Sequence, residues 1–225
     1  VELGWGGYWA WDPVENSSLM PWLVATAFLH SIMIQERKGM LKVWNVALAI
    51  LTYGLCIFGT FMTRSGIISS VHAFAQSNIG PFFATFLIFS LVFSFGLLWL
   101  RLPLLKADNR LESFASRETA FLLNNWVLLG MLFAVFWGTV FPLVSEAFTG
   151  EQITVGAPFF NQVNIPIGLV LLLLTGAGPL FAWRRTSNES LRKNFITPVT
   201  AGLIFVGFLF ALGLRDLYAL LSFGL

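Results

Sequence analysis

FFATFLIFSLVFSFGLLWLR, residues 82–101, contains one charged side chain, the arginine at its last position. A helix needs roughly 20 mostly apolar residues to cross the hydrocarbon core of a bilayer. Backbone N–H and C=O groups find no water there, so the stretch must be a helix or a strand of a closed barrel. Barrel strands alternate apolar and polar residues over about ten positions. This run does not alternate, and we therefore predict a transmembrane helix.

Five further stretches have the same character: 19–35, 43–62, 119–142, 165–184 and 196–214. A partial seventh span is expected to begin near Asp216. The composition agrees, because 57% of the residues are hydrophobic and only 11% are charged, whereas a soluble domain carries about 25% charged residues. We predict an all-α fold, a polytopic integral membrane helix bundle of about six spans plus the partial seventh. It should form a single membrane domain over 1–225, with short interfacial helices on the outer face.

The positions of lysine and arginine predict the orientation of this bundle. Loops on the cytoplasmic side of a membrane are enriched in these residues. The last residues of 82–101 and 165–184 and the loops after 19–35, 82–101 and 165–184 hold all but two of the 13 basic residues, the exceptions being Arg64 and Arg215. The segment 4–22 and the loops 63–81 and 143–164 should therefore face outward. The net charge of +2 gives no reason to expect a nucleic-acid partner.

The outward segment 4–22 reads GWGGYWAWDPVENSSLMPW and contains four of the nine tryptophans. Asp12, Pro13 and Glu15 are typical of a helix start, with an N-cap, a proline at the first position and a capping-box acid at the third. We expect a short helix at the outer interface. It should be preceded by a flexible, glycine-containing aromatic strip that carries Trp5, Trp9 and Trp11. Two interpretations remain open: an aromatic belt at the membrane surface, and a site for a large planar ligand.

Both histidines are candidate ligands to iron. His30 lies about nine residues beyond Pro21, or roughly 13 Å along a helix, which predicts a position near mid-depth in the bilayer. Ionisable groups inside a membrane are costly and often functional, but a packing role is also open. His72 lies in the loop 63–81, on a predicted interfacial helix, and could equally be a solvent-facing side chain. The lone cysteine, Cys56, excludes a disulfide within this chain and is expected to be a small buried apolar residue.

Three stretches resemble the haem-handling WWD-domain family of cytochrome c-type biogenesis. WGGYWAWDPVENSSLMPW (5–22) is similar to the tryptophan-rich signature of that family. The DPVEN form at 12–16 and the stretch GTFMTRSGIISSVHAFA (59–75) resemble its CcmF and NrfE branch more than CcsA. VGAPFFNQV (155–163) also resembles the CcmF pattern. Choosing between CcmF and NrfE stays open. Because the sequence starts at Val1 without a signal peptide and stops within an apolar stretch, we also expect it to be an excerpt of a longer protein.

The resemblance implies a function and a set of site residues. The family binds haem on the outer face and attaches it to the CxxCH thiols of apocytochrome c as a haem lyase. His30 stands where the family has a transmembrane ligand to a b-type haem, and His72 where it has an outward axial ligand. Trp5, Trp9, Trp11, Asp12 and Glu15 would frame the outward haem. Arg64 would bind a haem propionate, since arginine binds carboxylates bidentately, or it would simply snorkel at a helix end.

The resemblance also implies partners and a location. The expected partners are haem b, the haem chaperone CcmE, apocytochrome c, CcmH-type subunits and membrane lipid. The expected location is a bacterial inner membrane, with the haem site facing the periplasm. Two other functions stay open from the residues themselves. A haem exporter would usually show internal repeats, and we find none. A b-type electron-transfer protein would need paired transmembrane histidines, and His30 is the one histidine in the predicted spans.

Overall fold

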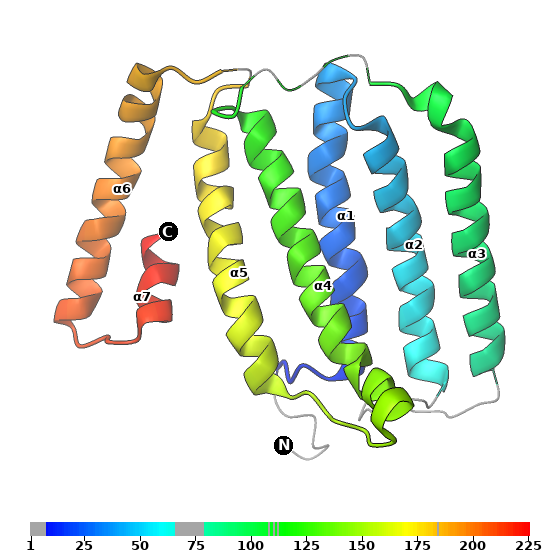
Figure 1. Cartoon of the computed structure of the whole chain (residues 1–225). Coiled ribbons are helices and arrows are strands. Elements are labelled where there is room, and N and C mark those ends of the chain that lie inside the picture. The colour runs from blue at the N-terminus through cyan, green and yellow to red at the C-terminus, as the bar shows by residue number, and fades with distance from the viewer. Residues whose placement is uncertain (1–7, 66–78, 108, 110, 112, 184) are drawn as a thin grey trace.

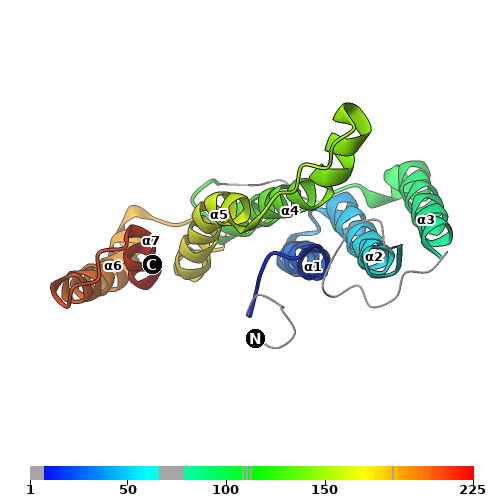
Figure 2. The same cartoon turned by 90° about the horizontal axis from the view of Figure 1, so that it is seen from below.

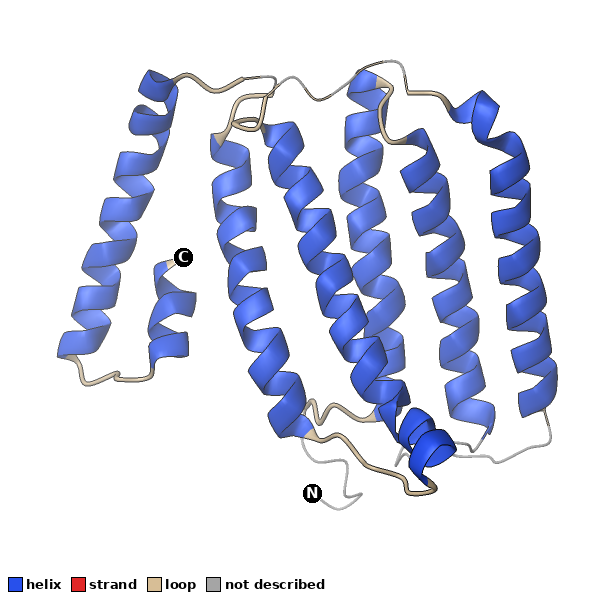
Figure 3. Cartoon of the chain, in the orientation of Figure 1, coloured by secondary structure: helices blue, strands red, loops and turns tan. Residues whose placement is uncertain are grey.

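The structure is a computed structural model that describes residues 8–65, 79–107, 109, 111, 113–183 and 185–225. Within these residues every regular element is helical (Figure 3). The elements are α1 (Pro13–Lys38), α2 (Lys42–Ser65), α3 (Gly80–Arg101), η1 (Leu102–Leu105), α4 (Arg117–Thr149), α5 (Ala157–Ala177), η2 (Gly178–Leu180), α6 (Asn188–Ala211) and α7 (Leu217–Gly224). Six helices are long and apolar enough to cross a membrane. The predicted fold class is confirmed.

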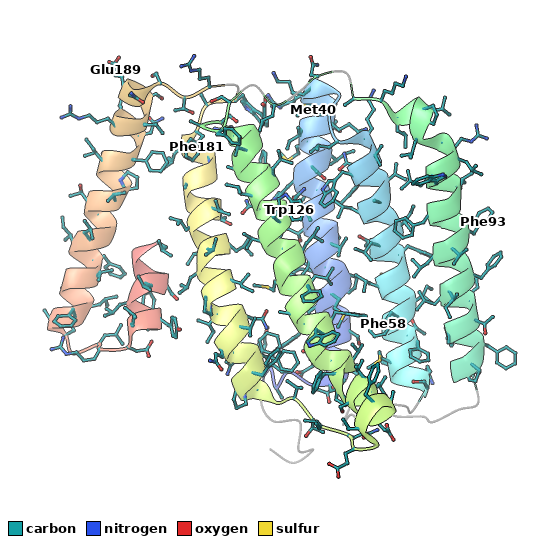
Figure 4. All side chains as sticks on the ribbon, in the orientation of Figure 1. Met40, Phe58, Phe93, Trp126, Phe181 and Glu189 are labelled. Atoms are coloured by element: carbon teal, nitrogen blue, oxygen red, sulfur yellow. The ribbon has the colours of Figure 1, made fainter. Side chains whose placement is uncertain are left out.

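The helices stand side by side in an elongated row (Figures 1 and 2). Along this row α1 packs against both α2 and α4, α2 against α3, and α4 against α5. The buried core lies where α1, α2 and α4 meet, and its buried members are Met20, Leu23, Val24, Ala27, Leu48, Leu55, Leu128 and Val135. Cys56 on α2 is exposed, and the expectation that it is buried was wrong. The outer helices present apolar side chains to their surroundings. Phe93 on α3, for example, is 60% exposed (Figure 4), as expected of a surface that faces lipid.

The first helix differs from the prediction. The sequence predicted a short interfacial helix followed by a span at 19–35, but α1 is one helix from Pro13 to Lys38 and contains Pro21. A proline removes one backbone donor, the one that would pair with the carbonyl four residues earlier. That carbonyl belongs to Ser17 and faces Gly59, whose missing Cβ would lie 3.4 Å from it. Helices in membranes tolerate such prolines because neighbouring elements compensate for the lost bond.

The fifth span was also misplaced. A span at 165–184 after a loop at 143–164 was predicted, but α4 continues to Thr149 and α5 already begins at Ala157. The connection is therefore only 150–156. Hydropathy detects the part of a helix that lies in hydrocarbon, so the polar turns before and after it are missed. The same reason explains why α6 begins at Asn188 and not at 196. A short helix, α7, begins where the partial seventh span was predicted, with Asp216 as its N-cap.

Candidate outward tryptophan site and histidine pocket

The capping box at the start of α1 holds the preceding segment in place. The Asp12 carboxylate accepts a hydrogen bond from the backbone N–H of Val14 at 2.9 Å. One oxygen of Glu15 accepts from the N–H groups of both Ala10 (2.9 Å) and Asp12 (3.1 Å). These are the contacts predicted from the sequence, extended by the bond to Ala10. Because Glu15 ties two backbone amides to the helix, it fixes the path of residues 10–12.

Trp11 is the most constrained residue of this segment. Its φ of +59° lies in the left-handed region, which costs a non-glycine residue roughly 1–2 kcal/mol. Its ring stacks on Phe160 at a centroid distance of 5.0 Å and an interplanar angle of 10°. Its indole N–H donates to Oδ1 of Asn161 at 2.8 Å, and its carbonyl accepts from the amide of Asn16 at 3.0 Å. Strained backbone held by its surroundings is often found at functional sites.

Trp9 occupies a different environment. It meets Trp11 edge to face at 5.8 Å and is 38% exposed, and Tyr8 before it is fully exposed. One face of Trp11 is already covered by Phe160, whereas Trp9 offers an open aromatic surface. The predicted aromatic strip therefore contains an anchor, Trp11, and an accessible ring, Trp9. Trp5 lies outside the described residues.

The other outward candidates are less completely placed. Arg64 lies in the last turn of α2, at the same end of the bundle as the start of α1 (Figure 1). His72 and most of the loop 63–81 fall outside the described residues. Among the residues that the structure describes, no group of three or more His, Cys, Asp or Glu side chains could hold a metal ion.

His30 borders a cavity of ≈ 240 Å³ between α1, α4 and α5. Its ring lies 5.3 Å from that of Phe121, which is only about one turn from the start of α4. The histidine is therefore closer to the basic end of the bundle than the predicted mid-depth. Its Nδ1 atom is buried and has no hydrogen-bond partner among the described residues. The walls of the cavity are mostly apolar.

Several residues around His30 escaped the sequence analysis. Asn124 lines the same cavity, and Arg117 donates to the carbonyls of Pro179 and Phe181. Both Arg117 and Arg37 lie over the ring of Trp183, which in turn packs on Phe121. No local pattern could reveal them, because each contact joins helices that are far apart in the sequence.

A buried ion pair at the basic end was also not predicted. Nζ of Lys38, in the last turn of α1, lies 3.5 Å from Glu118 Oε1, in the first turn of α4. Glu118 is fully buried, and neither of its oxygens accepts a hydrogen bond from any described residue. The pair joins the two helices that form most of the core.

Comparison with known proteins identifies relatives over nearly the whole chain. The family model described as "Cytochrome C assembly protein" matches residues 1–69. CcmF of Haemophilus influenzae is 43% identical over 96% of this chain and 33% of its own length, and CycK of Rhizobium meliloti is 44% identical over 90% and 30%. The chain is a relative of the CcmF proteins. A solved structure titled "Cytochrome c Heme Lyase CcmF" agrees with a TM-score of 0.74 at 36% identity, covering 99% of this chain and 32% of that one.

The similarity to CcmF confirms the predicted family. The chain spans about a third of the length of the curated relatives it matches. NrfE of Haemophilus influenzae is 40% identical over 77% of this chain, as the predicted branch implies. The part matched by the cytochrome c assembly model contains all the predicted site residues except His72. Phe160 and Asn161, which hold Trp11, lie outside that part but within the region similar to CcmF.

Proposed function

We propose that this chain acts in cytochrome c maturation as the haem-handling region of a CcmF-type haem lyase. It binds haem on the outer face of the membrane and presents it to the CxxCH thiols of apocytochrome c. One observation carries the proposal: the tryptophan segment is anchored on α5 through Trp11, while the adjacent Trp9 stays open. A flat, exposed aromatic ring beside a rigid anchor suits a large planar ligand. The names of the relatives support the same activity.

The proposed reaction requires no strong acid–base catalyst among the side chains. Haem, when bound, supplies two vinyl groups, and each thiol S–H adds across one C=C bond, so that no group leaves and no electron is transferred. The chain must hold the two partners in register, and positioning alone can supply a large part of a rate enhancement. Trp9 and Trp11 would support the haem plane, Arg64 would pair with a propionate, and His72 would bind the iron. Asp12 and Glu15 act through the backbone that carries the tryptophans.

His30 is proposed to bind a second, embedded haem b that keeps the outward iron reduced. The buried, unpaired Nδ1 and the mostly apolar cavity beside it support this role. Neutral imidazole is a common haem ligand. The described helices supply this single histidine, so His30 would hold the haem from one side.

The proposed location is a bacterial inner membrane with the tryptophan segment on the periplasmic side. The basic side chains of the α1–α2, α3–α4 and α5–α6 connections, which gather at the opposite end of the bundle, support this orientation. The proposed partners are a haem chaperone of the CcmE type, apocytochrome c and CcmH-type subunits. The apolar outer faces of α3 and α6 would contact lipid.

Optical spectra and cytochrome c yield of the full-length protein test the proposal. Trp9→Ala should lower the yield at least tenfold, whereas Trp22→Ala, a matched control on the exposed side of α1, should leave it near normal. Equal effects of the two would favour a plain aromatic belt. His30→Ala should remove a b-type signal. Loss of that signal with unchanged cytochrome c would instead favour a b-type electron-transfer role.

A further inference from the structure

A second cavity lies directly beneath Trp11, on the outer face. Its volume is ≈ 210 Å³, and it is enclosed by the tryptophan segment, α4, the connection 150–156 and the start of α5. Trp11, Pro13 and Phe160 form flat walls, and Gln152 and Thr154 form part of its rim. None of the functions proposed above uses this space.

Asn16 lines this cavity and carries a buried acceptor without a partner. Its amide nitrogen donates to the carbonyl of Trp11 and to the hydroxyl of Thr139, both at 3.0 Å. Thr139 gives its own hydrogen to the carbonyl of Val135 at 2.7 Å, so it can only accept from Asn16. The side-chain amide of Asn16 therefore cannot be flipped by 180°, and Oδ1 is the atom left without a hydrogen-bond partner. Asn16 is 1% exposed, and its Oδ1 has no partner among the described residues.

An unsatisfied buried acceptor costs roughly 1–3 kcal/mol, so the site favours a ligand with an N–H, O–H or S–H donor. The class of ligand is narrowed further because none of the described residues that line the cavity is charged. A haem propionate or a lipid phosphate would find no counter-charge, and a cation would find no carboxylate. The volume is also below the roughly 300–1,000 Å³ of sites for drug-sized molecules. A ligand of one or two neutral side chains fits.

We propose that this cavity is a subsite for an unfolded polypeptide segment, which inserts a neutral residue beside the Trp11–Phe160 stack and donates a hydrogen bond to Asn16. This inference rests on the proposed function and assigns a docking position for the acceptor protein. The subsite adjoins Trp9 through Trp11, so a segment seated here would bring its neighbouring residues to the open aromatic ring. Flat aromatic and proline walls with few polar groups are typical of such sites.

Peptide binding to the full-length protein without haem tests the subsite. The probe is a fluorescent unfolded peptide with a Cys-x-x-Cys-His segment, followed by anisotropy. Thr154→Trp places a large side chain at the rim of the cavity, from an exposed position. Phe148→Trp is the control at the same end of the bundle, because Phe148 is 86% exposed and does not line the cavity. Thr154→Trp should raise the Kd at least tenfold and Phe148→Trp less than twofold.

The outcomes separate the subsite from the proposed function. Weakened peptide binding in Thr154→Trp supports the subsite even if the protein matures no cytochrome c. Unchanged peptide binding overturns it even if maturation is normal, and indicates a cavity that holds only water. Loss of haem binding in Thr154→Trp with peptide binding retained would also overturn it, because the cavity would then belong to the haem site.

Discussion

The indole N–H of Trp11 donates a hydrogen bond to Oδ1 of Asn161, 150 positions away in the sequence, at 2.8 Å. This bond joins two of the three stretches that resemble the haem-handling family, 5–22 and 155–163. With the stack of Trp11 on Phe160, it fixes the tryptophan segment to the start of α5. The stretch 155–163 thus serves as the support on which the tryptophan segment rests.

Asn161→Leu should release Trp11. The variant removes the acceptor of the indole N–H, and a hydrogen bond of this kind contributes about 1 kcal/mol. We expect a loss of about that size in unfolding free energy in detergent, together with faster proteolysis near residues 8–12. Gln162→Leu changes the next residue, which is also exposed, and should alter neither. If both variants behave alike, the Trp11–Asn161 bond does not hold the segment.

Glu15→Ala should free the backbone before α1. The side chain accepts from two amides, and loss of a helix cap costs about 0.5–2 kcal/mol. Glu15→Gln keeps an acceptor oxygen but loses the charge, so its effect should be smaller. Hydrogen exchange at Ala10 and Asp12 would report the change directly. Ser18→Ala, which removes only a hydroxyl bonded to the carbonyl of Glu15, serves as the control and should leave that exchange unchanged.

The sequence predicted the helices because their signal is local. Long apolar runs place each span, and basic residues order the loops, so the fold class required no tertiary information. The start of α5 was missed because hydropathy detects only the apolar part of a helix. The continuity of α1 through Pro21 was missed because hydropathy does not show that a neighbouring helix can compensate for a missing N–H. The start of α1 at Asp12 was predicted correctly, because a capping box lies within four consecutive residues of the sequence.

The site was predicted less completely, for the same physical reason. Trp11 could be selected as an aromatic residue next to a helix cap, but its left-handed backbone and its stack on Phe160 depend on α4 and α5. The distinction between an anchored Trp11 and an open Trp9 therefore needed the structure. His30 was selected because a histidine in a span is unusual. Its position near the basic end became visible only from its contact with Phe121.

Lys38→Met should destabilise the protein strongly. It leaves the carboxylate of Glu118 buried without its cation, and breaking a buried pair from one side costs about 3–5 kcal/mol. Replacing both partners, as in Lys38→Met with Glu118→Leu, should recover most of that loss because no buried charge remains. Unfolding midpoints of the two single variants and the double variant complete the cycle. A double variant as unstable as the sum of the singles would show that the two side chains do not interact.

Gly138→Ala should disturb the tryptophan segment from within α4. A Cβ at this position would lie 2.7 Å from the ring of Phe160 and 2.9 Å from that of Phe159. Phe160 is 1% exposed, so it can yield only by moving against Trp11. We expect a loss of about 1–3 kcal/mol, as for other overpacked cores, and a lower yield of cytochrome c. The proteolysis near residues 8–12 should increase as it does in Asn161→Leu.

Gly130→Ala is the matched control for this prediction. It lies in the same helix, and a Cβ there would meet nothing within 4 Å. Alanine is favoured over glycine in a helix by about 0.5–1 kcal/mol, so this variant should be as stable as the parent or slightly more stable. A Gly138→Ala protein that matched Gly130→Ala in stability and proteolysis would mean that the Phe160 ring can move without carrying Trp11. The rigid link from α4 to the tryptophan segment would then be wrong.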